Sequence, residues 1–201
     1  GYTVLNLSMK GRELTCVGTL PMIGEGELIE ASGDYIEHAA YGKQFRIESY
    51  ETKVPQDSVA LERYLGSGAI KGVGAALAAR IVRRFGDDTL RIIEEEPERL
   101  AEVKGISERK AREIAQQVAE KAEMQNAMIF LSGYGIALNL GAKIYQQYGD
   151  NVYRILKENP YKMAEDIAGV GFRTADEIAG KIGIAVDSEF RIKSGLSYVL
   201  N

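Results

Sequence analysis

The chain has 201 residues, of which 45% are hydrophobic and 27% charged, and its formal net charge is −4 at pH 7. This composition is typical of a globular protein with a substantial core, and it excludes a uniformly basic nucleic-acid-binding surface. The longest apolar run, residues 127–131, is too short to span a bilayer, and residues 1–17 lack a signal-peptide pattern. We therefore expect a cytoplasmic protein without a membrane partner.

The acidic residues are unevenly distributed along the chain. Residues 1–66 contain 6 Lys/Arg and 10 Asp/Glu, whereas residues 67–126 contain 11 of each and residues 127–201 contain 8 of each. The whole acidic excess thus lies in the first third, which indicates a separate module. Any contact with nucleic acid must be local.

The first third has the pattern of β structure. Short apolar runs at residues 2–7, 13–20 and 43–51 are separated by the turn-like segments GEGE, SGD and YGK, at residues 24–27, 32–34 and 41–43. Several strands in about fifty residues predict a small β barrel. The single Cys16 and the single His38 lack the partners of a zinc or Cys/His catalytic site, so we expect a core cysteine and a loop or strand-end histidine.

Four aromatic residues of this segment allow two interpretations. Aromatic side chains on a small barrel can stack single-stranded bases, but alternating aromatics more often fill the core, and this segment is the acidic one. We favour the core for the four residues Tyr35, Tyr41, Phe45 and Tyr50.

From about Pro55 the hydrophobic period changes to that of helices. Two helices are predicted, over residues 74–85 and 107–122, because each places its apolar residues on one face. The first face consists of Leu77, Ala78, Ile81, Val82 and Phe85, and the second of Ala111, Ile114, Ala115, Val118 and Ala122.

The helical part contains an internal repeat, with one residue inserted in the second copy. The corresponding pairs are Gly72 and Gly135, Ile81 and Ile144, Phe85 and Tyr148, Gly86 and Gly149, Asp87 and Asp150, Ile92 and Ile155, Pro97 and Pro160, Gly105 and Gly169, Ala111 and Ala175, and Ile114 and Ile178. The chain after about residue 60 is therefore expected to consist of two copies of one all-helical unit.

Each copy contains two glycine-centred hairpins, at residues 70–74, 103–107, 133–137 and 167–171. The usual pattern is glycine, an aliphatic residue, glycine or serine, and then the start of a helix. We expect the aliphatic residue to fill the core and the small residues to leave backbone N–H groups uncovered at the helix N-terminus. Such groups can bind a phosphate of DNA without reading any base.

The four hairpins differ in the strength of this prediction. Lys71 and Lys104 precede the glycines of the first two hairpins, and Arg173 follows the fourth, which adds favourable charge. The third has Ala137 at the helix start and no neighbouring cation, so we expect a structural role there; the fourth has Ala168 in place of lysine, and both roles remain open. Ser107 can also cap its helix. The candidate DNA-binding residues are Lys71, Gly72, Val73, Gly74, Lys104, Gly105, Ile106, Ser107, Gly169, Val170, Gly171 and Arg173.

These hairpins resemble the helix-hairpin-helix motif, a binder of the DNA backbone. Three stretches, at residues 16–51, 62–106 and 159–179, are together similar to the N-terminal region of the RecD-like DNA helicases. The resemblance implies an α+β fold with three parts: an OB-like β barrel over residues 1–54, and an all-α tandem helix-hairpin-helix domain whose pairs occupy residues 55–126 and 127–201. It also implies a longer DNA repair or recombination enzyme that moves 5′ to 3′ on single strands with ATP and Mg²⁺.

The phosphate loop of a helicase motor, G-x-x-x-x-G-K-[ST], does not occur in this sequence. Its Gly-Lys pairs, at residues 42–43 and 180–181, are followed by Gln44 and Ile182, and the earlier glycine is also lacking. We therefore expect no cofactor and no catalysis from these residues, and we expect the motor of the same protein to follow them.

Two further interpretations need weighing. The acidic segment EEEPE, residues 94–98, suggests a metal site, but without complementary ligands it is better explained as a solvated turn between helices. The alternative to DNA binding is a non-catalytic interdomain or protein-interaction scaffold, in which the glycine hairpins serve only to pack helices.

Overall fold

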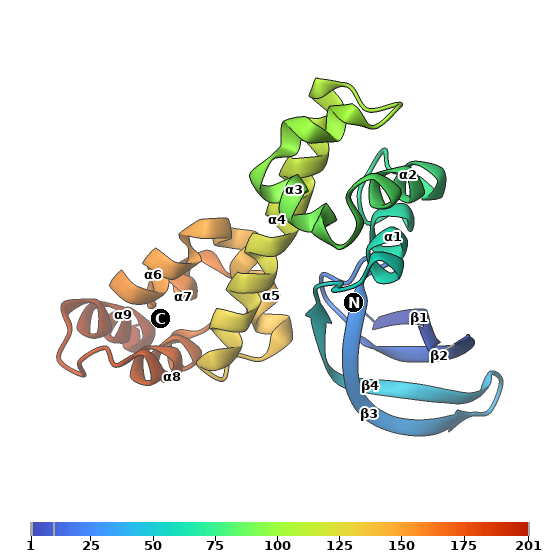
Figure 1. Cartoon of the computed structure of the whole chain (residues 1–201). Coiled ribbons are helices and arrows are strands. Elements are labelled where there is room, and N and C mark those ends of the chain that lie inside the picture. Colours follow the sequence, from blue (N-terminus) through green and yellow to red (C-terminus); the bar gives the residue numbers. More distant parts are fainter. Residues whose placement is uncertain (1, 10, 201) are drawn as a thin grey trace. The chain divides into compact units, whose positions relative to one another are not determined.

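The computed structural model describes residues 2–9 and 11–200, and these form a four-stranded sheet followed by helices (Figure 1). The chain divides into two compact units, residues 1–122 and 123–201. The first unit holds the sheet and the first two glycine hairpins, and the second holds the third and fourth hairpins. The expected α+β class is confirmed.

The sheet is built from two antiparallel hairpins. Its strands are β1 (Tyr2–Met9), β2 (Arg12–Thr19), β3 (Leu28–His38) and β4 (Gly42–Lys53), in the spatial order β1-β2-β4-β3. A short parallel pairing of Cys16 with Phe45 and of Val17 with Arg46 joins the two hairpins. Strands β1 and β2 are consecutive in sequence, and so are β3 and β4. Both antiparallel pairs therefore form between strands that are neighbours along the chain.

One predicted turn of this region is wrong. The segment SGD lies inside β3, where the pairing with β4 shifts register between Ser32 and Gly33. A side chain on Gly33 would place its Cβ only 1.9 Å from the carbonyl oxygen of Arg46, so the bulge requires glycine. The other two segments do lie at turns, before β3 and between β3 and β4.

The core of the sheet contains Cys16 and is covered by two of the four aromatic residues, Phe45 and Tyr50. Cys16 is fully buried, as expected, and burial raises the pKa of its thiol. Phe45 and Tyr50 pack against this core, but Tyr35 and Tyr41 are 59% and 76% exposed, so the core interpretation is wrong for these two. The lone histidine ends strand β3, as expected.

Helices begin directly after Pro55. The first unit contains α1 (Ser58–Gly66), α2 (Ala75–Phe85), the 3₁₀ turn η1 (Gly86–Asp88), α3 (Thr89–Glu95), the 3₁₀ segment η2 (Pro97–Glu102) and the start of α4 (Glu108–Gly133). Asp57 caps α1, since its Oδ1 accepts from the N–H of Ala60 at 2.8 Å. The two predicted apolar faces meet in one core that includes Leu77, Ala78, Ile81, Val82, Ala111, Ile114 and Val118.

Helix α4 is longer than the sequence predicted. It continues past Ala122 to Gly133, because no glycine or proline interrupts residues 108–132. The expected boundary at residues 126–127 therefore falls within a continuous helix. None of the described helices combines the length and the apolarity needed to cross a bilayer.

Within the first unit an ion pair ties the sheet region to α4. Glu27, in the connection before β3, accepts from the ammonium of Lys121 at 2.9 Å, and the Glu27 side chain is only 8% exposed. Tyr64, on α1, is half-buried, and this burial together with the negative charges of Glu27 and Glu94 raises its pKa to about 12.

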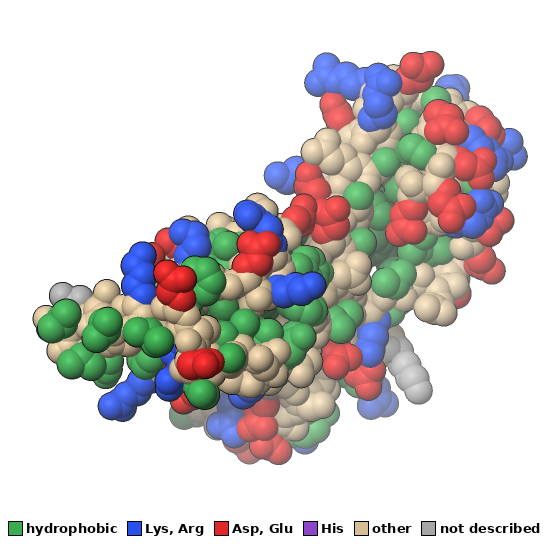
Figure 2. All heavy atoms as spheres, turned by 90° about the vertical axis from the view of Figure 1, so that its left-hand side faces the viewer, with side chains coloured by type: hydrophobic (Ala, Val, Ile, Leu, Met, Phe, Trp, Pro, Cys, Tyr) green, Lys and Arg blue, Asp and Glu red, His purple; other side chains and the backbone are tan. Residues whose placement is uncertain are grey.

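The second unit has its own core. Its elements after α4 are α5 (Leu138–Tyr148), the 3₁₀ turn η3 (Gly149–Asn151), α6 (Val152–Glu158), α7 (Lys162–Asp166), α8 (Phe172–Ile182) and α9 (Glu189–Leu200). Hydrophobic side chains gather on the surface of α9 (Figure 2), and they include Phe190, Ile192, Leu196, Val199 and Leu200. Arg191 holds this helix to α8 through hydrogen bonds of 2.7 and 3.1 Å to the carboxylate of Asp176.

The internal repeat is confirmed by the structure. Gly86 and Gly149 end α2 and α5 with the same backbone conformation, φ of 60° and 53°, and each begins a 3₁₀ turn that leads into a short helix. Ile81 and Ile144 are both 0% exposed. The two copies therefore share their helix ends and their core positions.

Candidate nucleic-acid interface

The four hairpin glycines adopt a backbone conformation that favours glycine. Gly72, Gly105, Gly135 and Gly169 have φ values of 82°, 99°, 66° and 86°. A side chain in this left-handed region is strained, so the turn itself explains a glycine at each place. Phosphate approach is not needed to account for Gly72.

The residue after each of these glycines fills the core, as predicted. Val73, Ile106, Ile136 and Val170 are all buried, whereas the flanking hairpin residues at positions 71, 72, 74, 104, 105, 107, 169 and 171 are exposed. Each hairpin is therefore pinned by one aliphatic side chain while its backbone stays at the surface.

Gly74 and Gly171 differ from the turn glycines. They precede α2 and α8 in an extended conformation, with φ of −87° and −92°, and no atom of the described residues crowds the place where a Cβ would stand. Neither backbone strain nor packing requires glycine at these two positions. A side chain there would project over the exposed start of the helix.

In the first hairpin several amides are left uncovered. The N–H of Val73 donates to the Ile70 carbonyl at 3.2 Å, and the N–H of Lys71 donates to the side chain of Gln117. Within the part of the chain that the structure describes, the amides of Gly72 and Ala76 have no acceptor, whereas the backbone at Gly74 forms an antiparallel bridge with Ser67.

The second hairpin leaves a similar set of amides. The N–H of Ile106 donates to the Val103 carbonyl at 3.1 Å, and Ser107 Oγ accepts from the N–H of Lys110 at 3.2 Å, so Ser107 does cap its helix. Among the described residues, the amides of Gly105, Glu108 and Arg109 have no acceptor. The first and second hairpins thus both offer donors at the start of a helix of more than ten residues.

The third hairpin uses its amides internally. The N–H of Gly135 donates to the Ser132 carbonyl at 2.8 Å, and the N–H of Ile136 donates to the Leu131 carbonyl at 3.2 Å. These bonds close the C-terminal end of α4 in the manner of a Schellman motif. Its glycine amide is therefore engaged, unlike those of Gly72 and Gly105.

Each hairpin glycine lies near a cation from the helix that follows the paired hairpin. Measured from the position of a Cβ on the glycine, Lys110 lies 3.8 Å from Gly72 and Arg80 lies 3.4 Å from Gly105. In the second unit Lys181 and Lys143 lie 3.3 and 3.8 Å from the corresponding positions on Gly135 and Gly169. Sequence reasoning missed these four cations, although Arg80 and Lys143 occupy equivalent places in the repeat.

The predicted cations are exposed and unpaired. Among the described residues, no carboxylate lies within ion-pair distance of Lys71, Lys104 or Arg173. Arg173 follows the fourth hairpin on α8, whereas the two lysines belong to the first and second hairpins. The structure therefore places Lys71 and Lys104 in the first unit and Arg173 in the second.

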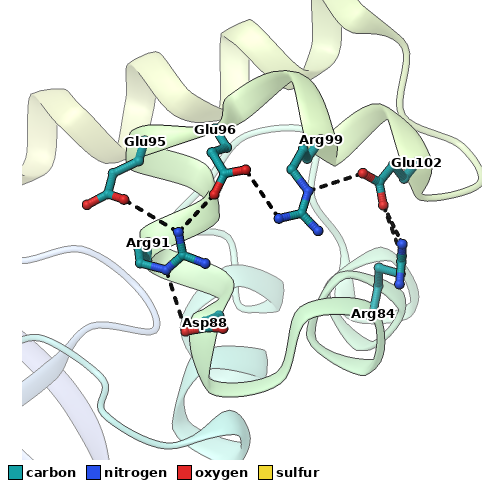
Figure 3. Close-up of polar contacts among 7 residues, drawn as sticks. All are labelled: Arg84, Asp88, Arg91, Glu95, Glu96, Arg99 and Glu102. Carbon is teal, nitrogen blue, oxygen red and sulfur yellow. Dashed lines mark hydrogen bonds and ion pairs between the residues drawn. The ribbon is translucent and has the colours of Figure 1, made fainter.

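Other arginines of the first unit are engaged by the acidic segment (Figure 3). Arg91 lies 2.8 Å from Glu96 and 3.4 Å from Glu95, and Arg99 lies 3.2 Å from both Glu96 and Glu102. The arginines hold the pKa values of Glu96 and Glu102 below their ordinary range. The segment is an exposed junction between α3 and η2, as expected, and no group of metal-ligating side chains is found among the described residues.

Comparisons with known proteins agree with this architecture. A family model described as the HHH (helix-hairpin-helix) domain of the ATP-dependent RecD2 DNA helicase matches residues 69–119 and 120–201. A second, described as the OB-fold domain of the ATP-dependent DNA helicase YrrC, matches residues 1–55. No solved structure matches the chain.

A curated relative extends the similarity to the whole chain. The ATP-dependent RecD2 DNA helicase of Deinococcus radiodurans is 25% identical over 210 residues, which cover 100% of this chain and 29% of that relative. The chain thus spans less than a third of the length of this relative. On the match of its two helical repeats and of its N-terminal sheet, the chain belongs to the RecD2 DNA helicase family and corresponds to its N-terminal OB-fold and helix-hairpin-helix region.

Proposed function

We propose that this chain binds the sugar-phosphate backbone of DNA without reading base sequence, through the first and second hairpins. The observation that carries the proposal is that both hairpins present uncovered amides at the start of a helix, next to the unpaired Lys71 and Lys104. The family to which the chain belongs consists of DNA helicase domains, which supports DNA as the partner.

Three features of each hairpin favour the binding of a phosphate. Helix N-termini carry a partial positive charge and unsatisfied N–H groups, which suit an anion. Lysine adds a full charge that gains from the release of counterions when it meets a phosphate. None of these groups reaches a base edge, so the binding carries no sequence preference. Lys110 and Arg80, which lie beside the glycine turns, extend the same positive surface.

We further propose that the complete protein is an ATP-dependent helicase that moves 5′ to 3′ on single strands in DNA repair or recombination. The name of the Deinococcus relative and the family of the domains support this proposal. The ATP and Mg²⁺ would be bound by a motor with a phosphate loop, which the 201 residues of this chain do not contain. The role of this chain would be to hold DNA for that motor.

The decisive experiment is a salt titration of DNA affinity, measured by fluorescence anisotropy with a labelled oligonucleotide. Replacing both lysines, Lys71→Ala with Lys104→Ala, should weaken binding and lower the log–log salt slope by about 0.7–0.9 for each phosphate that the variant no longer binds. The control is Arg91→Ala, which removes a cation already paired with carboxylates and should leave the slope unchanged. An unchanged affinity and slope in the lysine variant would instead favour the scaffold alternative.

A second variant tests the approach of the backbone itself. Gly74→Val places a bulky side chain over the start of α2, where none of the described residues obstructs it, so the fold should tolerate it. We expect weaker DNA binding from Gly74→Val and near-normal binding from Gly74→Ser, because serine occupies the equivalent place in the second hairpin. Equal affinities for the two variants would exclude close contact at this amide.

A further inference from the structure

In the first unit, each hairpin is held by the helix that follows the other. Gln117 on α4 contacts both backbone groups of Lys71: the Lys71 N–H donates to Gln117 Oε1 at 2.7 Å, and Gln117 Nε2 donates to the Lys71 carbonyl at 3.2 Å. Reciprocally, Arg80 on α2 donates to the Lys104 carbonyl at 2.7 Å. Since α2 follows the first hairpin and α4 the second, the two hairpins are interlocked.

The contact made by Gln117 is specific in its geometry. A planar amide that both donates to and accepts from the backbone of one residue restrains the position and the orientation of that residue. Lys71 directly precedes the turn at Gly72, so the restraint acts on the segment that carries the uncovered amides. Gln117 is half-buried and takes up the amide of Lys71, which leaves those of Gly72 and Ala76 for a ligand.

The corresponding contact in the second unit is weaker. Lys181 occupies the place of Gln117 in the repeat, and its ammonium reaches the Gly135 carbonyl at 3.5 Å, a single long contact from a flexible side chain. An ammonium can only donate, so it cannot also accept from a backbone N–H as the amide of Gln117 does. The two-point interlock is therefore a feature of the first pair.

We propose that Gln117 is a positioning residue for DNA binding: it fixes the first hairpin relative to the second, so that both sets of amides are pre-ordered for phosphates. Gln117 does not itself contact DNA. A pre-ordered hairpin loses less conformational freedom on binding, and the difference appears as affinity. This inference rests on the proposed function of the two hairpins.

The test is Gln117→Ala in the whole chain, with DNA affinity measured across a salt series. Loss of the two hydrogen bonds to Lys71 predicts binding weaker by about tenfold. The salt slope should not change, because no cation is removed. The matched control is Gln116→Ala on the same helix, whose side chain is exposed and bonds to Glu120; its affinity should equal that of the unchanged protein. Gln117→Met, which keeps the side-chain length, guards against a folding defect and should give the same loss.

A double-variant cycle separates positioning from general destabilisation. In a Gly74→Val background, where the first hairpin no longer meets DNA, Gln117→Ala should cause little further loss. An additive loss, an unchanged affinity for Gln117→Ala, or a loss equal to that of Gln116→Ala overturns the inference. If the lysine double variant binds DNA with normal affinity, the proposed function fails together with this inference. If the lysine double variant binds DNA more weakly but Gln117→Ala binds normally, only the positioning role of Gln117 is overturned.

Discussion

The two pairs of hairpins, one in each compact unit, are copies of one sequence repeat, but they present different surfaces. Both use a glycine in the left-handed region followed by a buried aliphatic residue, and both end α2 and α5 with the same glycine conformation. In the first pair both turn-glycine amides are uncovered and the hairpins interlock. In the second pair the third hairpin uses its amides to end α4. The comparison shows that the turn and the core define the fold, while the amides and cations around them define what can bind.

A second contrast concerns how each copy holds a carboxylate that closely precedes its second hairpin. In the first copy Glu102 pairs with Arg84 and Arg99 at the surface. In the second, Asp166 accepts from the hydroxyl of Tyr148 at 2.9 Å, and the residue equivalent to this tyrosine in the first copy is Phe85. The carboxylate before the second hairpin is therefore held by arginine ion pairs in one copy, and by a partly buried tyrosine hydrogen bond together with Lys162 in the other.

The largest expected effect tests whether the two cores are equivalent. Ile81→Ala and Ile144→Ala remove fully buried side chains at matching positions, and each should lower the free energy of unfolding by about 3 kcal/mol. Denaturant unfolding monitored by circular dichroism measures this, and hydrogen exchange assigns it to a unit. Ile129→Ala, at a site 62% exposed, should change it by less than about 0.5 kcal/mol. A loss below about 1 kcal/mol at only one buried site would show that the copies pack differently.

An intermediate effect is expected at the turn glycines. Gly105→Ala and Gly169→Ala force an alanine into the left-handed region and should each cost about 1–2 kcal/mol of stability. Gly74→Ser, in extended backbone with open space around it, should be nearly neutral. The unfolding midpoint in urea measures the three variants side by side, and a neutral Gly105→Ala would contradict the conformational explanation.

The smallest effect concerns acid stability. The Tyr148 hydroxyl, and then Lys162, hold the pKa of Asp166 below its ordinary value, so the native state binds this proton less readily than the unfolded chain. The resulting stabilisation is present above about pH 4, the region of the unfolded pKa, and is lost as the pH falls through the lower folded pKa. Tyr148→Phe, which imitates the first copy, should raise the pKa of Asp166 and weaken this acid dependence.

An NMR titration of the Asp166 carboxyl carbon measures the shift directly. Glu102 serves as the internal control, because Arg84 and Arg99 lower its pKa and the substitution in the second unit should not move it. Added salt should raise the pKa of Glu102 towards its ordinary value, since exposed ion pairs are screened. An Asp166 pKa that does not respond to Tyr148→Phe would assign its depression to Lys162 instead.

Local sequence signals predicted much of the fold. The repeat register identified matching core residues such as Ile81 and Ile144, and the glycine hairpins predicted the buried plugs such as Val73. The SGD segment was wrongly predicted as a turn, because a β-bulge and a turn use the same residue types. Only the close approach of the Arg46 carbonyl distinguishes them here. Tyr41 was wrongly assigned to the core because it lies in the turn between β3 and β4, and Tyr35 because it is exposed although its cross-strand partner Phe45 packs against the core.

The sequence by itself determined the periodicity, the repeat and the turns, since these depend on backbone conformation and on residues close along the chain. Only the tertiary structure decided which side chains from distant helices reach each hairpin. Gln117 lies 46 residues from Lys71, and Arg80 lies 24 residues from Lys104. Those contacts arise from the packing of helix against helix around a shared core, which fixes positions in space that no local pattern encodes.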